Sequence, residues 1–236
     1  MLLKQKYQIR LRYFIQLAYN GKNYHGWQNQ PKAISVQEVI ENALKTILKE
    51  EISIVGAGRT DSGVHAKQMF AHFDSDIFFS EMDLVFKLNS FLPKDIAIQD
   101  IFKVKPESHA RFDALSRTYK YRVALQKNAF NFDESYYLAK HLDIDKMNEA
   151  ANVLFQYKDF QCFSKSNTDV KTYHCDIKEA HWSLMDDELH FIVKADRFLR
   201  NMVRAIVGTM INIGEGKLEV SDLHEIIKSF PFQRLH

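Results

Sequence analysis

Apolar and polar residues alternate in some stretches of the chain and recur at helical spacing in others. Residues 11–18 alternate, which predicts a strand. Ser35 followed by Glu38 forms a capping box, and apolar residues at helical spacing continue to Leu48, so a helix is predicted there. The same reading predicts strands at 52–55, 68–73 and 96–104 and a second helix at 83–89.

The second half of the chain repeats this order. It predicts a strand at 117–125, a helix at 145–155, a hairpin of strands 173–184 and 188–195, a helix at 198–213 and a short helix capped by Ser221. The order strand, helix, two strands, helix, strand is compatible with a ferredoxin-like or RRM-like unit. We therefore predict an α+β fold with two such half-domains, 1–105 and 106–236, each with an antiparallel sheet. The pattern offers no closing strand after the last helix, so we expect that strand to be very short or missing.

Composition narrows the class of protein. The 236 residues are 46% hydrophobic and 26% charged, which is typical of a globular protein. The net charge is only +2, so contact with nucleic acid would depend on local clusters of charge. Cys162 and Cys175 form no Cys-x-x-Cys pair, and we expect two reduced thiols. We find no signal-peptide pattern and no apolar run of the roughly 20 residues that a membrane span needs, and so expect a cytoplasmic protein.

One loop concentrates the candidate chemistry. Three of the eight glycines, Gly56, Gly58 and Gly63, surround Arg59 and Asp61, which predicts a tightly bent loop that fixes these side chains. The loop lacks the third glycine of a dinucleotide-binding fingerprint and the Gly-Lys-Ser/Thr of a phosphate-binding loop. On spacing alone it is more typical of a surface turn in which the aspartate caps the backbone.

Resemblance changes that interpretation. The sequence Arg-Thr-Asp-Ser-Gly-Val-His-Ala at 59–66 resembles the active-site signature of the tRNA pseudouridine synthase A family. Further segments resemble that family in the same order: Tyr19–Gln28 with Gln37, Leu88–Ile96, His109–Phe112, Ser116–Tyr121, Asp159–Phe163 and Phe198–Arg204. The resemblance implies an enzyme that isomerises uridine to pseudouridine on the 3′ side of the anticodon arm of tRNA. It also implies a pseudouridine synthase fold, no cofactor, and a homodimer bridged by the tRNA.

The resemblance assigns the catalytic residues. Asp61 would be the nucleophile, because a carboxylate can attack an electrophilic carbon. Whether it attacks the sugar C1′, attacks the base at C6 or assists a glycal route is open at this point. Tyr119 would stack on the uracil or help to remove the C5 proton, whereas Tyr121 on the same face is expected to be structural. Arg204 would keep Asp61 ionised, and the active site would lie in a cleft between the half-domains.

Several arginines are expected to contact the RNA. Arg59 would help to open it, and Arg111, Arg117 and Arg200 would bind the substrate. We expect Arg197, Arg200 and Arg204 to form a basic ridge on the predicted helix 198–213. Cations near the motifs are candidates for phosphate contacts: Lys22, Lys67, Lys120 and Arg122.

Two other classes of function compete with this reading. One is a non-catalytic protein that binds and chaperones tRNA on the same scaffold. The other is a metal-dependent hydrolase built on Asp61, His65 and His72, but their spacing matches no common ligand set, so no metal site is expected.

Overall fold

The computed structural model describes residues 10–130, 132–165, 170–185 and 187–229, and it divides into two compact units, Met1–Ala114 and Leu115–His236. The division falls later than the boundary predicted between residues 105 and 106. The segment that follows residue 104 bonds to the first sheet: Arg12 donates to the carbonyl of Ser108 at 3.0 Å, and the Ala110 N–H donates to His72 at 3.1 Å. Side-chain hydrogen bonds therefore extend the first unit beyond its last strand.

The first unit is a four-stranded antiparallel sheet with two helices. Its elements are β1 (Leu11–Tyr19), a 3₁₀ turn (Gly21–Asn23), α1 (Val36–Leu48), β2 (Val55–Gly56), β3 (Ala66–Ser75), α2 (Glu81–Phe91) and β4 (Ile96–Val104). The strand order is β2-β3-β1-β4, and Ile15 on the central strand lies opposite Ala71 and Ile101. This is the order of a ferredoxin-like unit, as the sequence predicted.

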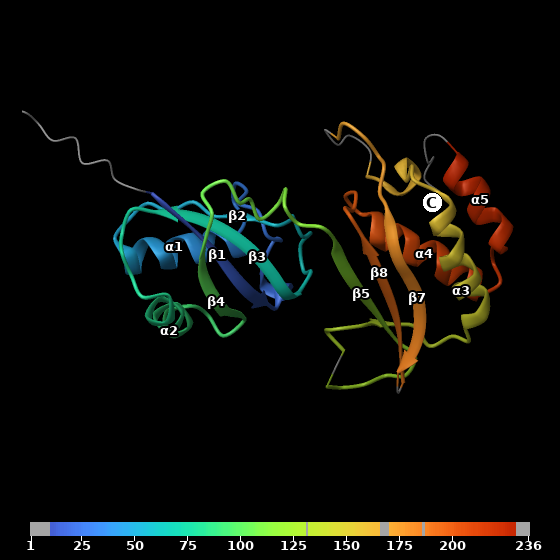
Figure 1. Ribbon diagram of the computed structural model, residues 1–236. Helices are drawn as coiled ribbons and strands as arrows, with labels where there is room; N and C mark the ends of the chain where they lie inside the picture. The colour runs from blue at the N-terminus through green and yellow to red at the C-terminus, as the bar shows by residue number, and fades with distance from the viewer. Residues whose placement is uncertain (1–9, 131, 166–169, 186, 230–236) are drawn as a thin grey trace, which may run out of the picture. The chain divides into compact units, whose positions relative to one another are not determined.

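Alternation along β1 explains the layering of the first unit. Every second residue from Tyr13 to Tyr19 is buried, and these side chains pack with Ile40 and Leu44 of α1 and Leu84 and Leu88 of α2. Both helices therefore cover the same face of the sheet (Figure 1). Helix α1 begins where predicted, because the Ser35 hydroxyl accepts from the Glu38 N–H at 3.1 Å.

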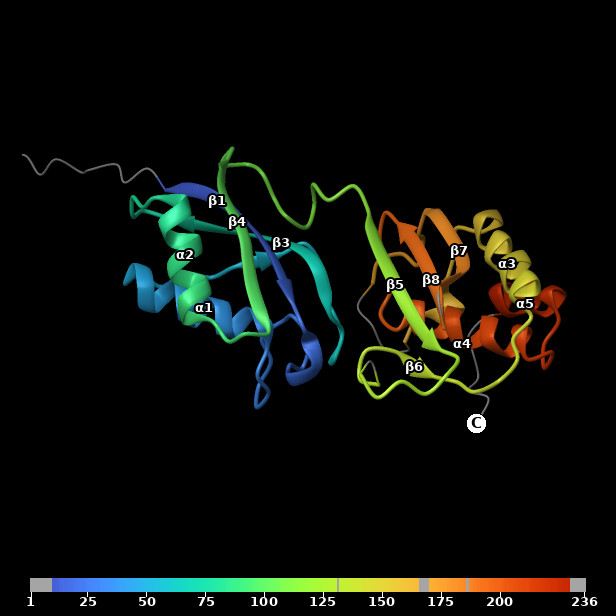
Figure 2. The same ribbon diagram turned by 90° about the horizontal axis from the view of Figure 1, so that it is seen from below.

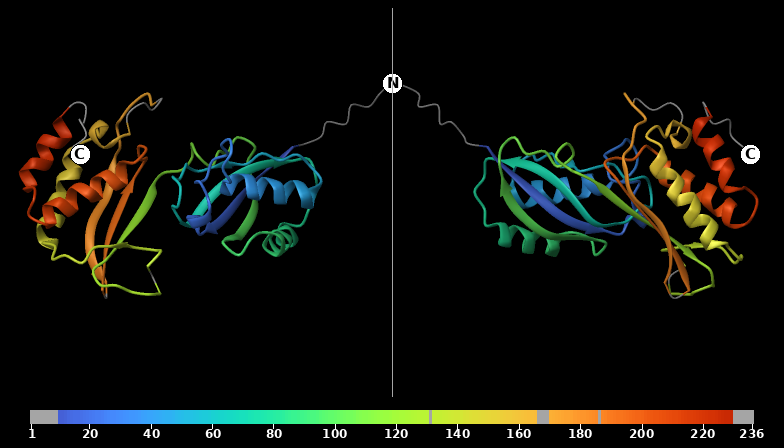
Figure 3. Two further views of the ribbon diagram at one scale, coloured as in Figure 1. Left: turned by 180° about the vertical axis from the view of Figure 1, so that it is seen from behind. Right: turned by 45° about the vertical axis from the view of Figure 1, so that its right-hand side comes forward.

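The second unit has a four-stranded sheet covered by three helices on one face, as two further views show (Figure 3). Its elements are β5 (Arg117–Ala124), β6 (Tyr136–Tyr137), α3 (Ile144–Val153), β7 (Ile177–Met185), β8 (Glu188–Ala195), α4 (Met202–Gly214) and α5 (Val220–Lys228), with 3₁₀ turns at Leu154–Gln156 and Gln161–Phe163. The order β6-β5-β8-β7 repeats that of the first unit, except at one edge.

The edge strand β6 departs from the predicted antiparallel sheet. It pairs in parallel with the end of β5, through Val123–Tyr136 and Ala124–Tyr137 (Figure 2). A ferredoxin-like unit has its closing strand at this edge. The expectation of a very short or missing closing strand falls on residues 230–236, which lie outside the described residues.

Some local predictions differ from the structure. Only Val55 of the predicted strand 52–55 is in a strand, because side chains of α1 satisfy the backbone of Ile54: its N–H donates to Glu41 and its carbonyl accepts from Gln37. Helix α5 is capped by Glu219, whose capping box includes Asp222, rather than by Ser221.

Helix α4 begins at Met202 instead of residue 198, because Asn201 has a left-handed backbone with φ of 69°. Arg197 and Arg200 therefore precede the helix. The prediction of a basic helical ridge formed with Arg204 is wrong.

Neither cysteine is paired. Cys162 and Cys175 are free and buried, and burial raises the pKa of each thiol to about 12. Within the described part of the chain, no helix is both long and apolar enough to cross a bilayer.

Candidate functional site

The loop that carries Asp61 connects β2 to β3. Gly56 pairs with Ala71, and the Ala57 N–H donates to the Phe70 carbonyl at 2.7 Å, so the loop leaves a hydrogen-bonded ladder. Within it the Val64 N–H donates to the Asp61 carbonyl at 3.2 Å, which closes a turn directly after the aspartate. Asp61 is half-buried and Arg59 is exposed.

Residues 19–27, called here the supporting segment, are hydrogen-bonded to this loop on both sides of Asp61. The Tyr19 hydroxyl is 2.9 Å from the Thr60 hydroxyl, and the Trp27 N–H donates to the Thr60 carbonyl at 3.3 Å. On the other side of Asp61, the Gly63 N–H donates to the Tyr24 carbonyl at 3.2 Å. The backbone on both sides of Asp61 is therefore fixed by one neighbouring segment.

Two glycines of the supporting segment allow the close approach. Gly26 has φ of 88°, and a Cβ there would lie 2.3 Å from the Thr60 carbonyl oxygen. A Cβ at Gly21 would lie 2.0 Å from the Val64 carbonyl oxygen. No other residue type fits at either position without moving the loop.

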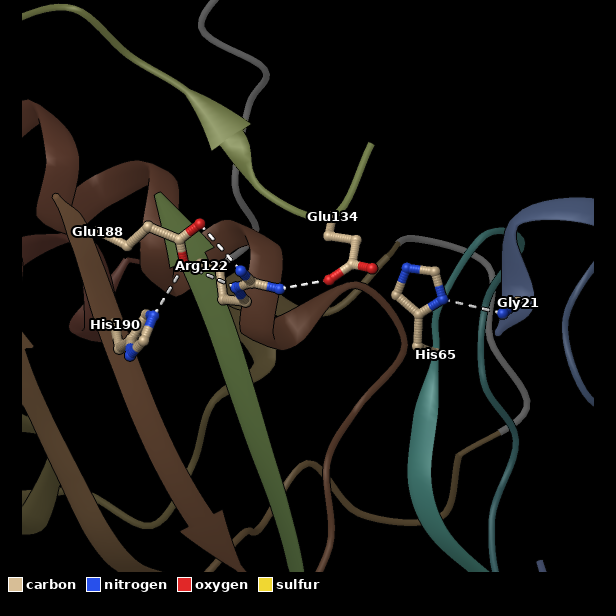
Figure 4. A network of polar contacts seen from close by, with 6 residues as sticks. All are labelled: Gly21, His65, Arg122, Glu134, Glu188 and His190. Carbon is tan, nitrogen blue, oxygen red and sulfur yellow. Dashed lines mark hydrogen bonds and ion pairs between the residues drawn. The ribbon is translucent and has the colours of Figure 1, made fainter. Parts of the chain in front are cut away.

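His65 bonds to the same segment. Its Nδ1 accepts a hydrogen bond from the Gly21 N–H at 2.9 Å (Figure 4). Among the residues that the structure describes, no three His, Cys, Asp or Glu side chains lie together as metal ligands would. His65, considered above as a metal ligand, is thus a hydrogen-bond acceptor that fixes the end of the loop.

Asp95, just before β4, supports the segment in turn. One carboxylate oxygen accepts from the Tyr24 hydroxyl at 2.6 Å, and the other accepts from Asn23 at 3.1 Å. Burial, together with Asp95, raises the pKa of Tyr24 above its ordinary value. Sequence analysis identified residues 19–28 only by resemblance and missed the role of Asp95, since no local pattern links it to Tyr24.

Arg111 lies on a turn whose backbone N–H groups are hydrogen-bonded to side chains. Four consecutive backbone N–H groups, from residues 109 to 112, donate to side chains: Asp113 accepts the first at 2.7 Å, His72 the second, and His109 the third and fourth. His72 is buried, and that burial lowers its pKa to about 4. The turn presents Phe112, with Arg111 5.9 Å from its ring centroid.

Tyr119 and Arg204 belong to the second unit. Tyr119 lies on β5, opposite Val193, and its ring packs edge-on against Phe198 with centroids 5.1 Å apart. Arg204 is exposed on α4 and lines a hollow of about 370 Å³ together with Tyr121. Tyr121, expected to be structural, is thus the β5 tyrosine that shares a hollow with Arg204.

The remaining predicted arginines of the second unit differ in their surroundings. Arg117 donates to the Asp196 carbonyl at 2.7 Å, and Arg200 is exposed before α4. Arg122 bonds to Glu188 at 2.7 and 2.9 Å and to Glu134 at 2.7 Å, and His190 contacts Glu188 at 3.0 Å (Figure 4). Because Glu188 and Glu134 bind three nitrogens of its guanidinium, Arg122 is better explained as a support of the sheet than as a phosphate contact.

The structure brings some predicted site residues together. Arg59 and Asp61 share one loop of the first unit, which also carries Arg111 on its separate turn. Tyr119, Arg117, Arg200 and Arg204 belong to the second unit. The predicted cleft therefore stays a prediction. The first unit by itself offers a half-buried carboxylate on an externally braced loop, which suits a nucleophile that must keep one position.

Known proteins resemble the chain over most of its length. The family described as tRNA pseudouridine synthase matches residues 16–113 and 150–234. A protein named tRNA pseudouridine synthase A from Parabacteroides distasonis is 53% identical over 221 residues, which cover 92% of this chain and 87% of that protein. Its namesake from Bacteroides fragilis is 52% identical over 92% of this chain and 87% of its own length. A Clostridium perfringens protein named tRNA pseudouridine synthase A 2 is 36% identical over 91% of this chain and 89% of its own.

Proposed function

Since this chain belongs to the tRNA pseudouridine synthase A family of isomerases, we propose that it modifies uridines on the 3′ side of the anticodon arm, with Asp61 as its nucleophile. The observation that carries the proposal is that hydrogen bonds to the supporting segment fix the loop around Asp61. Thr60 and Gly63, on either side of the aspartate, are hydrogen-bonded to the supporting segment. A nucleophile held in one position lowers the barrier by reducing the entropy that must be lost on reaction.

The isomerisation breaks the bond between uracil N1 and ribose C1′ and forms a bond between C5 and C1′. The proton on C5 is lost, and N1 gains one, so the reaction needs no redox partner. Asp61 provides the carboxylate that reacts with or stabilises the electron-poor carbon. A base that starts in a stem must be flipped out, which costs a few kcal/mol.

Other residues of the chain have supporting roles in this proposal. Tyr119 stacks on the uracil or assists removal of the C5 proton, and Arg204 favours the ionised form of Asp61. Arg59 helps to open the RNA. Arg111, Arg117 and Arg200 contact the substrate, and the satisfied turn at 109–112 supports this role for Arg111 by fixing its backbone.

The proposal also concerns the cellular location and the oligomeric state of the protein. The substrate is tRNA, so we place the protein in the cytoplasm. We also propose that it acts as a homodimer, as the family resemblance implies.

Release of tritium tests the function directly. The wild-type protein is incubated with a tRNA transcript labelled at uridine C5, and a second transcript carries cytidine in place of the uridines on the 3′ side of the anticodon arm. We expect tritium release from the first transcript and none from the second. Equal release from both would disprove the anticodon-arm assignment, and binding of tRNA without release from any transcript would favour a non-catalytic binding protein. Release should be unchanged by a chelator, whereas a metal-dependent enzyme would lose it.

A further inference from the structure

Helix α2 presents large apolar side chains to solvent. Phe78, just before the helix, is 87% exposed, and Met82 and Phe86 are 83% and 74% exposed. The spacing of four residues places Met82 and Phe86 in one stripe on the helix, since an α-helix has about 3.6 residues per turn, and Phe78 lies in the segment just before the helix begins. Leu84 and Leu88 on the opposite side are buried in the core. An exposed apolar stripe of this kind marks an interaction site in a globular protein.

One flank of the stripe carries charges at the same spacing. Asp83 and Lys87 are one turn apart. In the described part of the chain neither Asp83 nor Lys87 has an ion-pair partner. Beside them lies a hollow of about 300 Å³, lined by the end of α1, by α2 and by the segment before α2, which includes Ile77 and Phe78.

We propose that this surface, the α2 face (Ile77, Phe78, Met82, Asp83, Phe86 and Lys87), binds the same surface of a second copy of the chain. In an antiparallel pair of α2 helices about a two-fold axis near Leu84, Met82 lies opposite the partner's Phe86. Each surface is used twice, as a two-fold dimer requires.

Charge complementarity favours a second copy of the chain as the binding partner of the α2 face. In antiparallel helices the same flank of each helix meets its copy, so Asp83 approaches the partner's Lys87 and Lys87 approaches the partner's Asp83. A single acidic and a single basic residue thus form two ion pairs. RNA is a poorer occupant, because Lys87 is the only cation among the six residues of the face and Asp83 lies beside it. The inference rests on the homodimer included in the proposed function and assigns its surface.

Molar mass in solution tests the α2 face. Light scattering or sedimentation equilibrium should give the mass of two chains for the wild-type protein. Phe86→Glu should raise the dimer dissociation constant by at least about 30-fold, because it places a charge at the centre of the apolar stripe. Leu184→Glu, a similar change at a 54% exposed residue of β7, should leave the dimer intact. Far-ultraviolet circular dichroism checks that each variant is folded.

Exchange of charges tests the register. Asp83→Lys or Lys87→Asp alone should weaken the dimer, and the double variant D83K/K87D should recover it because both cross-axis pairs return. A monomeric wild-type protein, a dimeric Phe86→Glu variant, or a double variant no tighter than the single ones would each overturn the proposal. Tritium release by the same samples reports the synthase activity separately, so a monomer that releases tritium would contradict only the α2 dimer.

Discussion

The backbone N–H of Gly21 donates to Nδ1 of His65 at 2.9 Å, and this bond joins the supporting segment to the end of the loop that carries Asp61. Gly21 is buried, so its N–H depends on this acceptor. We therefore infer that His65 positions the loop rather than reacting with the substrate.

Removing the acceptor should impair catalysis more than binding. His65→Ala leaves the Gly21 N–H without its partner, which costs about 1–3 kcal/mol and loosens the loop. We expect kcat for tritium release to fall on the order of 100-fold, because small displacements of a reacting group have effects of that size. The dissociation constant for tRNA should change little. His65→Asn keeps an acceptor and should recover part of the rate; a His65→Ala enzyme with wild-type kcat would show that the bond does not position Asp61.

His72 should make the stability of the first unit depend on pH. Burial lowers its folded-state pKa from 6.5 to about 4, so the unfolded chain takes up a proton first as the pH falls. The contribution of His72 to the free energy of unfolding is complete above pH 6.5 and is lost between 6.5 and 4. The loss should be on the order of 2–3 kcal/mol.

The measurement uses the two tryptophans, Trp27 in the first unit and Trp182 in the second. In a Trp182→Phe background, denaturant unfolding followed by Trp27 fluorescence reports the first unit. The slope of stability between pH 6.5 and 4 should be clearly smaller in His72→Gln than in the protein with His72. Equal slopes would assign the pH dependence to other groups.

Substitutions of Arg122 and Arg200 should have opposite effects: the first should lower stability, and the second should weaken RNA binding. Arg122→Met removes a guanidinium that binds Glu188 and Glu134, with the Glu188 side chain only 16% exposed, and should destabilise the second unit by about 1–2 kcal/mol. Its affinity for tRNA should match the wild type.

Arg200→Met should do the opposite, with stability nearly unchanged and tRNA affinity lowered about 3- to 10-fold. The slope of log affinity against log salt concentration should fall by about 1 if the lost contact is to a phosphate. Filter binding over a range of salt concentrations distinguishes the two. Weaker tRNA binding by Arg122→Met at unchanged stability would return that arginine to the RNA-contacting set.

The sequence predicted the parts of the fold that local rules control. Alternation located β1 and β4, and the Ser35 hydroxyl fixed the start of α1. The prediction failed where contacts with residues distant in the sequence, or the backbone conformation of one residue, determine the local structure. Side chains of α1 replace strand pairing at Ile54, and the left-handed backbone of Asn201 delays α4. The two-residue strand β6 is too short to show any periodicity.

The candidate site likewise has residues that the sequence proposes and contacts that it does not predict. The sequence proposes Asp61 and Arg59 as site residues because one continuous signature carries them, and Tyr119 and Arg204 because segments around them resemble the family. The bracing of the loop was not found. It depends on contacts such as Tyr19 with Thr60, which are 41 residues apart in the chain, and on Asp95, which no motif connects to the loop.

Substitution of Asp61 tests the central claim. Asp61→Asn keeps the size of the side chain but removes its charge and nucleophilicity, and Asp100→Asn is the same change at an exposed residue of β4. Both variants are incubated with tRNA labelled with tritium at uridine C5, and their tRNA affinity is measured in parallel. The account predicts that Asp61→Asn binds tRNA as the wild type does and releases no tritium above background, while Asp100→Asn releases it at the wild-type rate. Tritium release by folded Asp61→Asn at a rate near that of the wild type would contradict the account.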